Sequence, residues 1–296
     1  MAEEKKLDKL NPKYFEQKLL EKDISLTIEK LIGKGGQKQV YSAQMKDNSQ
    51  SVVFKVMIPS GNMVERVKRE VRATVLINHP NIPKILFHNL HDTLIQNDFV
   101  WIIEEFVAGD SLRALLKSGK TFNISEMVTF LNTMLSILSK SEQHSIVHRD
   151  IKPENIIVGK NGKFWLIDFG ISRHLDLESI TSSSSPIGPH TLGYSASEQF
   201  RNRKKDIDIR ADFFSLGVVA AEMIIGQNPY LEGTHDALQL IKKIEQQPLP
   251  ILRIEGDSQY FLARFIKTLG DNRPSRRPMN TDSAIRIFNL VKDSLK

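Results

Sequence analysis

The stretch from His148 to Gly170 constrains this chain more than any other, because it gathers polar functional groups around two apolar runs. Its sequence is HRDIKPENIIVGKNGKFWLIDFG. The apolar runs are separated by Asn161-Gly162, a dipeptide that favours a type I′ hairpin turn with positive φ at both central residues. A hairpin here brings Asn155, just before its first strand, close to Asp168, just after its second. Two converging oxygen ligands suit a hard cation such as Mg²⁺.

Both ends of this stretch resemble the protein kinase family. The first part matches the catalytic loop H-R-D-L-x-x-x-N, with Ile151 in place of Leu, and the last part matches D-F-G. The resemblance implies that Asp150 accepts the proton of a substrate hydroxyl and that Lys152 steadies the transferred phosphoryl group. It also implies that Asn155 and Asp168 hold Mg²⁺, with Mn²⁺ as an alternative.

The bulk composition describes an ordinary globular chain and excludes several classes. The 296 residues, with 40% hydrophobic and 26% charged content, allow one large or two modest domains. The absence of cysteine excludes a disulfide framework and fits a reducing compartment. No apolar run approaches the roughly 18 residues of a membrane helix, and the charged start lacks the apolar centre of a signal peptide. We therefore expect a cytoplasmic protein with no membrane segment in this chain.

The net charge of +6 raises the question of a nucleic-acid partner. Lysine and arginine are spread along the chain rather than gathered with aromatic residues on one element. We therefore expect a solvated basic surface and no nucleic-acid binding.

The N-terminal part of the chain reads as an extension followed by strands. Residues 1–24 are rich in charge, with leucines and Phe15 at loosely helical spacing, which predicts either a short helix packed on the body or a flexible tail. Alternating and apolar runs then predict strands at 26–32, 40–45 and 52–57.

The sequence GKGGQKQV between the first two strands resembles the glycine-rich loop of kinases. Gly33, Gly35 and Val40 are in register with that motif, whereas Lys38 takes the place of its third glycine. Glycine allows backbone N–H groups to approach phosphate oxygens closely. The resemblance implies that this loop holds the phosphates of ATP.

Lys55 interrupts an otherwise apolar strand, and a buried amine is costly unless it meets an anion. The resemblance implies two partners, the α/β-phosphates of ATP and a glutamate on the next helix, which is predicted over about 62–77 with valines 64, 67, 71 and 75 on one stripe. Glu70 lies at the family's position for that glutamate, and Glu65 is the rival. The alternative is that Lys55 reaches solvent from an edge strand.

Residues 99–106 predict a strand leading into the hinge between two lobes. In the register that the resemblance implies, Glu104 takes the position deepest behind the adenine pocket, where the family usually has an apolar residue. An acid there could pair with Lys55 and compete with Glu70. Alternatively, the register is shifted by one and Ile103 fills the site. The resemblance implies an adenine site made by Val53, Glu105, Phe106, Val107 and Ile157.

The remaining sequence predicts a mainly helical lobe. Ser111 is placed to cap a short helix, and Asn123 with Glu126 predicts a capping box at the start of a long one. The resemblance puts Asp212 beneath the catalytic loop, bonded to the backbone of residues 148 and 149.

A segment rich in Ser and Thr resembles the activation segment of kinases, and Thr191, Tyr194 and Glu198 match its end. The resemblance implies a buried ion pair between Glu198 and Arg277. Because a guanidinium binds phosphate bidentately, Arg149 suggests that phosphorylation within residues 181–185 orders this segment.

These observations predict an α+β protein with a bilobal, protein-kinase-like fold. We expect an extension over 1–24, a nucleotide-binding lobe over 25–106 with a small antiparallel sheet and one main helix, and a larger, mainly helical catalytic lobe over 107–296. The implied activity is ATP-dependent phosphorylation of Ser or Thr on protein substrates. The alternatives are an ATP-binding pseudokinase scaffold and a small-molecule phosphotransferase of similar fold.

Overall fold

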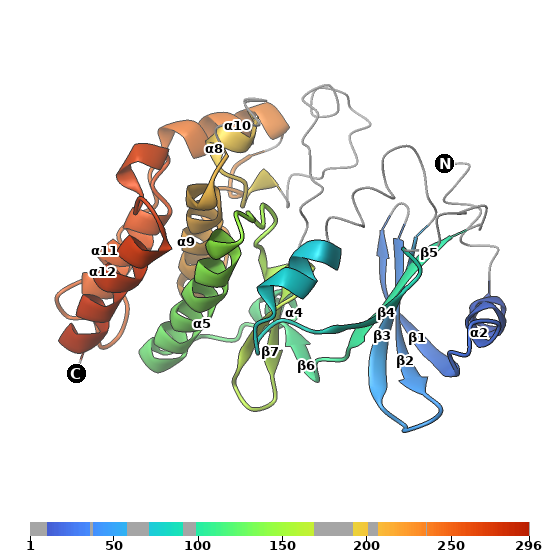
Figure 1. The fold of residues 1–296 in the computed structure, drawn as a ribbon. Coiled ribbons are helices and arrows are strands. Elements are labelled where there is room, and N and C mark those ends of the chain that lie inside the picture. The colour runs from blue at the N-terminus through green and yellow to red at the C-terminus, as the bar shows by residue number, and fades with distance from the viewer. Residues whose placement is uncertain are drawn as a thin grey trace. The chain divides into compact units, whose positions relative to one another are not determined.

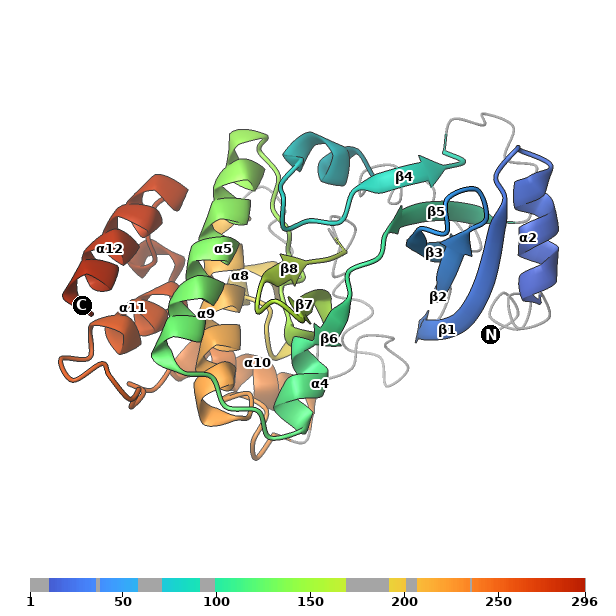
Figure 2. The ribbon, with the colours of Figure 1, turned by 90° about the horizontal axis from the view of Figure 1, so that it is seen from below.

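The computed structural model describes residues 11–295 except residues 36–37, 58–70, 91–98, 169–191, 201–206 and 235. The chain divides into two compact units (Figures 1 and 2). The first unit contains Met1–Asn78 and Pro83–Val107, and the second contains His79–Ile82 and Ala108–Lys296.

The first unit is built on an antiparallel sheet of five strands in the order β1-β2-β3-β5-β4. The strands are β1 (Leu26–Gly35), β2 (Lys38–Met45), β3 (Ser51–Met57), β4 (Ile85–His88) and β5 (Val100–Glu105). The four predicted strands are therefore present, with ends that differ by a few residues. β3 lies inside the sheet, between β2 and β5.

One face of this sheet is covered by helix α2 (Pro12–Leu20), which packs against β1 (Figure 1). The Asn11 side chain caps the helix by accepting from the Tyr14 N–H. Phe15 and Leu19 are fully buried in the core on this face, and Glu16 accepts from the Ile28 N–H at 2.7 Å. Residues 12–20 therefore form the packed helix that was one of the two expectations for the extension.

A smaller core contains Met57, Val71, Leu90, Val100 and Ile102. Of the predicted helix over 62–77, residues 71–77 are described and helical. Val71 is buried as expected, but Val75 is 59% exposed and the prediction of its burial was wrong. Ala73 and Ile77 are the buried residues instead. Residues 64, 65, 67 and 70 lie outside the described part of the chain.

The second unit combines a three-stranded sheet with helices. The sheet has the order β6-β7-β8, from β6 (Gly109–Ser111), β7 (Ile156–Gly159) and β8 (Phe164–Leu166). The helices are α4 (Leu112–Lys117), α5 (Ile124–Gln143), α8 (Ser197–Phe200), α9 (Ile209–Ile225), α10 (Ala237–Gln246), α11 (Phe261–Leu269) and α12 (Thr281–Ser294), with 3₁₀ turns η1 (Pro153–Asn155) and η3 (Pro274–Arg276).

Helix α9 is the centre of the second unit, because nearly all of its residues are buried between α5 and α11. Its close approach to α11 depends on glycine. A Cβ at Gly217 would lie 2.4 Å from the backbone nitrogen of Gly270, so no larger residue fits without moving a helix.

Local capping signals at the start of two other helices are confirmed. The Ser111 hydroxyl accepts from the Ala114 N–H at the start of α4. Asn123 and Glu126 form a reciprocal capping box at the start of α5. Among the described residues, no helix has the length and apolar character needed to cross a bilayer.

Candidate active site

The hairpin of β7 and β8 brings the two ends of the catalytic stretch together. Ile156 pairs with Leu166, and the Ile167 N–H donates to the Asn155 carbonyl oxygen at 2.9 Å. Residue 155 therefore lies beside the strand end that leads to Asp168, as the two apolar runs predicted. Asp168 itself has a φ of +58°, an unusual conformation for a residue that is not glycine.

The turn of this hairpin differs from the expected type. Gly162 has a φ of +74°, but Asn161 does not have positive φ, so the expected type I′ turn was wrong. The Gly162 N–H donates to the Gly159 carbonyl at 2.8 Å, and the Gly159 N–H donates to the Lys163 carbonyl at 2.8 Å. Asn161 instead accepts from the Lys163 N–H through its side chain. This is a type I turn followed by a left-handed glycine.

Two polar side chains of the catalytic loop, Asn155 and Lys152, contact Asp150. The Asn155 amide nitrogen donates to the Asp150 carbonyl at 2.8 Å and to Asp150 Oδ2 at 2.9 Å. The Lys152 ammonium lies 3.0 Å from the same carboxylate oxygen. Because Asn155 donates through its nitrogen, its amide oxygen is the atom left to bind a cation.

Asp212 supports this loop from α9. Its two carboxylate oxygens accept from the N–H groups of His148, at 2.7 Å, and Arg149, at 2.8 Å. This contact confirms the expected position of Asp212. Burial raises the pKa of its carboxyl to about 7, although the two backbone hydrogen bonds act in the opposite direction. Arg149 has a φ of +64°, so these bonds hold the loop in a strained conformation.

His148 is completely buried at the start of the loop. Its Nδ1 accepts from the Asp150 N–H at 3.3 Å. Burial lowers the pKa of the imidazole to about 4, despite the nearby carboxylates of Asp150 and Asp168. His148 is therefore neutral at neutral pH and serves as a packed hydrogen-bond acceptor.

In the first unit, Lys55 is paired with Glu104. The ammonium lies 2.6 Å from Glu104 Oε1, with the side chains 4% and 11% exposed. Because β3 is an internal strand, the alternative of an edge-strand lysine was wrong. Val53 pairs with Glu104 across β3 and β5, so Glu104 is on the Lys55 face of the sheet. Ile103 points to the opposite face, into the core beneath α2.

The glycine-rich sequence forms the paired ends of β1 and β2. Gly33 pairs with Val40, and Gly35 pairs with Lys38 across residues 36–37. Val40 also pairs with Lys55, which puts it on the same face of the sheet as the ammonium.

The predicted site residues fall into two groups. The first unit holds Gly33, Gly35, Val40, Val53, Lys55, Glu105, Phe106 and Val107, and the second holds Asp150, Lys152, Asn155, Ile157 and Asp168. Glu105 is tied to the Lys84 backbone by hydrogen bonds through its N–H and its carboxylate. Glu70 lies outside the described residues, as do residues 181–185 and 191.

The segment after the Ser- and Thr-rich stretch is fixed by the predicted ion pair. Arg277 Nη1 lies 2.5 Å from Glu198 Oε1, and the arginine side chain is fully buried. Arg277 also donates to the carbonyl oxygens of Asp271 and Arg210. This contact confirms the expected pairing of Glu198 with Arg277.

Sequence reasoning missed a further ion pair, between the partly buried Arg113 and the buried Glu222. Neither residue belongs to a motif used above. They are 109 positions apart in the sequence, so no local pattern signals the contact.

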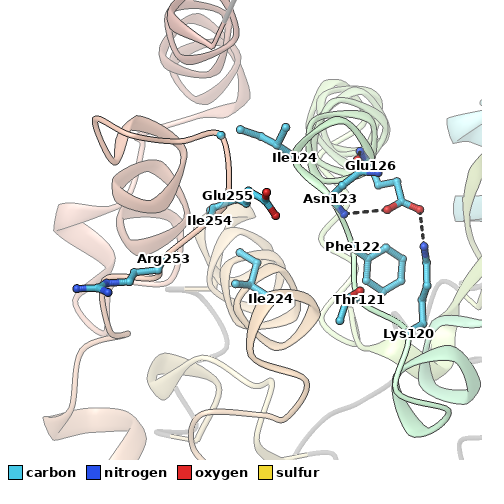
Figure 3. Close-up of a pocket in the computed structure, with 11 residues that line it drawn as sticks. Lys120, Thr121, Phe122, Asn123, Ile124, Glu126, Ile224, Arg253, Ile254 and Glu255 are labelled. Carbon is cyan, nitrogen blue, oxygen red and sulfur yellow. Dashed lines mark hydrogen bonds and ion pairs between the residues drawn. The ribbon is translucent and has the colours of Figure 1, made fainter.

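A pocket of about 710 Å³ in the second unit lies outside the predicted site (Figure 3). It is lined by the start of α5, by Ile224 at the end of α9 and by residues 253–256. Lys120 forms an ion pair with Glu126 at its edge. None of the predicted site residues that the structure describes lines this pocket.

The available donors fit Mg²⁺ better than a transition metal. Within the described ranges, no group of three or more His, Cys, Asp or Glu side chains is close enough to hold a metal. Asn155 and Asp168 offer one amide oxygen and one carboxylate. Mg²⁺ is commonly bound in this way, by one or two protein oxygens with phosphate oxygens and water.

Comparison with known proteins decides the family. The chain matches the protein kinase domain over residues 26–285. It belongs to the protein kinase family. This kinase chain is 28% identical to the protein named probable serine/threonine-protein kinase of Clostridium acetobutylicum, over 90% of its own length and 40% of the relative's. The N-lobe and C-lobe of the family correspond to the first and second units.

Two further relatives carry similar names. The serine/threonine-protein kinase PrkC of Bacillus subtilis is 28% identical over 69% of this kinase chain and 31% of its own length. The serine/threonine-protein kinase PknA of Mycobacterium tuberculosis is 28% identical over 76% and 52%, respectively. The chain thus spans about half or less of the length of these relatives.

Proposed function

We propose that this protein transfers the γ-phosphoryl group of ATP to Ser or Thr hydroxyls of protein substrates. The observation that supports the proposal most strongly is the contact of Asn155 with both Asp150 and the backbone of Ile167. This contact fixes a candidate base and two candidate metal ligands relative to one another. Phosphoryl transfer depends mainly on such positioning and on electrostatic stabilisation.

Asp150 is the proposed acceptor of the substrate proton. Its carboxylate is oriented by Asn155 and lies 3.0 Å from the Lys152 ammonium. Lys152 is a positive charge beside the position that the acceptor oxygen must reach. It is therefore suited to stabilise negative charge on the transferred phosphoryl group.

The nucleotide contacts proposed here come from both units. Lys55 binds the α/β-phosphates, and Gly33 and Gly35 of β1 cover them. Glu70 is proposed as a further carboxylate partner of Lys55. Asn155 and Asp168 would hold Mg²⁺, which neutralises phosphate charge when bound. Adenine would lie against Val40, Val53 and Ile157 and bond to the backbone of Glu105, Phe106 and Val107.

Protein hydroxyls are favoured over small molecules as acceptors by two features. Lys152-Pro153 and the sequence of residues 191–198 belong to the kinase pattern, and small-molecule phosphotransferases of similar fold typically lack both. Glu198, at the end of that sequence, pairs with Arg277. The names of the three relatives also support a Ser/Thr acceptor. A scaffold function is disfavoured because Lys55, Asp150 and Asp168 are all present.

Incubation with γ-labelled ATP, Mg²⁺ and a generic protein substrate separates these possibilities. The wild type is expected to label Ser or Thr, identified by acid hydrolysis of the product, and Asp168→Asn is expected to label nothing. Glu29→Gln, an exposed acid of β1, serves as the control. Label on a small molecule alone, or equal labelling by wild type and Asp168→Asn, would reject the proposal.

Regulation by phosphorylation is a second part of the proposal. Arg149 precedes the proposed base directly, and residues 181–185 are one Thr and four Ser. We expect autophosphorylation there to raise activity through a bond between phosphate and Arg149. Phosphatase treatment should lower activity, and full activity of a variant with alanine at all five positions would rule this part out.

A further inference from the structure

Helix α2 makes a polar contact with the sheet in addition to its apolar packing. The Ile28 N–H of β1 donates to Glu16 Oε1 at 2.7 Å, across twelve positions of the chain. The helix precedes residue 26, where the match to the kinase domain begins. Glu16 therefore lies outside the motifs that the family supplies.

The contact is made at the open edge of the sheet. β1 is an edge strand, so its outward N–H groups have no neighbouring strand to bond. The Lys46 N–H donates to the Ser25 carbonyl at 2.9 Å, so residue 25 is bonded toward β2. Bonding directions alternate along an antiparallel strand, and Ile28, three residues further on, therefore faces outward. Glu16 replaces the missing neighbour at this position.

Glu16 is held in place by the packing of its own helix. Phe15, the residue before it, is fully buried, with its ring centroid 5.0 Å from that of Phe99 and 5.8 Å from that of Phe54. Leu19, one turn later, is also fully buried. Both views of the fold show α2 lying beside β1 (Figures 1 and 2). The acceptor thus belongs to a packed element and not to a flexible chain.

The contact lies just before the irregular part of β1. The register of β1 against β2 shifts twice between Ile28 and Gly33. Over this span β1 advances five residues, while β2 advances three, from Ala43 to Val40. β1 therefore carries two extra residues, and such bulges bend a strand and re-aim the groups that follow.

The position of the glycines depends on where these extra residues are accommodated. Val40 pairs with Gly33 on one side and with Lys55 on the other. A bulge that moved along β1 would shift Gly33 and Gly35 by one residue relative to Val40, and so relative to Lys55. A shift of one residue also reverses the direction of every following group. A fixed Ile28 N–H holds the start of the irregular stretch in place.

We propose that Glu16 is a positioning residue for the phosphates of the nucleotide. By holding Ile28, it keeps the bulged part of β1 in one register and Gly33 and Gly35 in the place where they cover the phosphates. The inference rests on the nucleotide site proposed above. The side chains proposed to contact adenine lie on β2, β3 and β7. Loss of Glu16 should therefore weaken phosphate binding and leave adenine binding unchanged.

Titration calorimetry with Mg-ATP and with adenosine tests this division. Glu16→Ala is expected to bind Mg-ATP at least about fivefold more weakly, the effect of one hydrogen bond of about 1 kcal/mol. Its affinity for adenosine should stay within about twofold of the wild type. Glu16→Gln keeps an acceptor oxygen and should bind both ligands as the wild type does.

Matched controls separate positioning from damage to the fold. Gln17→Ala changes the exposed neighbour on the same helix and should leave both affinities unchanged. If Glu16→Ala does not fold, Glu16→Met is compared in the same way, because its side chain has a similar length and no oxygen. A variant that is only less stable would have a lower melting temperature but an unchanged ratio of the two affinities.

Hydrogen exchange at the Ile28 amide gives a second readout that needs no nucleotide. By NMR, this amide should exchange slowly in the wild type and in Glu16→Gln, and at least about tenfold faster in Glu16→Ala, because its only acceptor at the sheet edge is lost.

Four results would overturn the inference. They are unchanged Mg-ATP affinity in Glu16→Ala, equal losses for Mg-ATP and adenosine, a Glu16→Gln variant as weak as Glu16→Ala, and a wild-type Ile28 amide that exchanges at the rate of an unprotected one. A wild type that binds neither ligand would instead count against the nucleotide site proposed above, while exchange at Ile28 still reports on the contact.

Discussion

The Lys55 ammonium lies 2.6 Å from a Glu104 carboxylate oxygen on the neighbouring strand β5. One carboxylate partner of this lysine is therefore supplied by the sheet itself. An ammonium has three donors, so the contact with Glu104 is compatible with further bonds to phosphate oxygens. Glu104 also occupies the face of the sheet that carries Val40 and Val53, where the family usually has an apolar side chain.

Replacement of Glu104 by Gln should weaken both the fold and nucleotide use. The variant removes the charge partner of a buried ammonium, and a hydrogen bond between charged groups contributes about 1.5–3 kcal/mol. We expect unfolding by urea to show a loss in this range and kcat/KM for ATP to fall about tenfold. Glu29→Gln is the exposed control. Higher activity in Glu104→Gln would show instead that Glu104 competes with the nucleotide for Lys55.

Replacement of Glu104 by Met tests its effect on the shape of the proposed adenine site. We expect Glu104 to narrow that site and to exclude bulky ATP-competitive inhibitors, because its charged side chain is held against Lys55. Glu104→Met should bind such inhibitors at least tenfold more tightly, as measured by competition with a fluorescent nucleotide. Unchanged inhibitor affinity would mean that Glu104 does not limit access.

Replacement of either residue of the Glu198–Arg277 pair should destabilise the folded state strongly. Arg277 is fully buried and has three further carbonyl partners, so Glu198→Gln or Arg277→Met leaves an uncompensated charge or unsatisfied acceptors. Each is expected to lower the free energy of unfolding by about 3–5 kcal/mol. The exposed pair Lys18–Glu21 is the comparison, with an expected effect of at most about 1 kcal/mol.

A double-mutant cycle isolates the interaction itself. The double variant of Glu198 and Arg277 should lose clearly less stability than the sum of the single variants. Strict additivity would show that the two side chains contribute independently and that the pair is not what fixes this segment.

Burial of His148 makes stability sensitive to acid. Its pKa is lowered to about 4 in the folded state from 6.5 when unfolded, so the unfolded chain takes up this proton first as the pH falls. The contribution is complete above pH 6.5 and is lost progressively toward pH 4. Complete loss of this contribution lowers the unfolding free energy by about 3 kcal/mol, because a pKa difference of one between the folded and unfolded states corresponds to about 1.4 kcal/mol.

Comparison with His148→Phe isolates this effect. Between pH 7 and pH 4 the unfolding free energy of the wild type should fall by about 3 kcal/mol more than that of the variant. Asp212 has a raised pKa, so its protonation increases the unfolding free energy as the pH falls through this range. Because Asp212 is present in both proteins, its contribution cancels in the comparison. His144→Asn, at an exposed position, should behave as the wild type. Parallel curves for wild type and His148→Phe would contradict the assigned pKa.

The sequence predicted those features that depend on local chemistry or on a recurrent motif. The capping box of Asn123 and Glu126 lies within four consecutive residues and can be identified from that short sequence. The hairpin next to Asn155 is predicted by two apolar runs separated by a glycine. The turn type was predicted wrongly because the Asn161 backbone does not adopt the positive φ that a type I′ turn requires. Its side chain instead accepts a hydrogen bond from the Lys163 N–H.

Long-range contacts were predictable only where a family motif supplied them. The Glu198–Arg277 pair was found in that way, whereas the Arg113–Glu222 pair was not, although both join residues far apart in the chain. The choice between Glu104 and Ile103 depended on which face of β5 packs beneath α2. That is a property of strand register, which the apolar run 99–103 before Glu104 left undetermined.

The central claim is that Lys55 and Asp168 act on one Mg-ATP, and titration calorimetry tests it most directly. The wild type should bind ATP in Mg²⁺ and lose most of that affinity in EDTA. Lys55→Met should bind ATP at least tenfold more weakly yet bind adenosine normally, and Asp168→Asn should no longer respond to Mg²⁺. Equal Mg-ATP affinity in the wild type and both variants, or no binding by the wild type, would contradict the account.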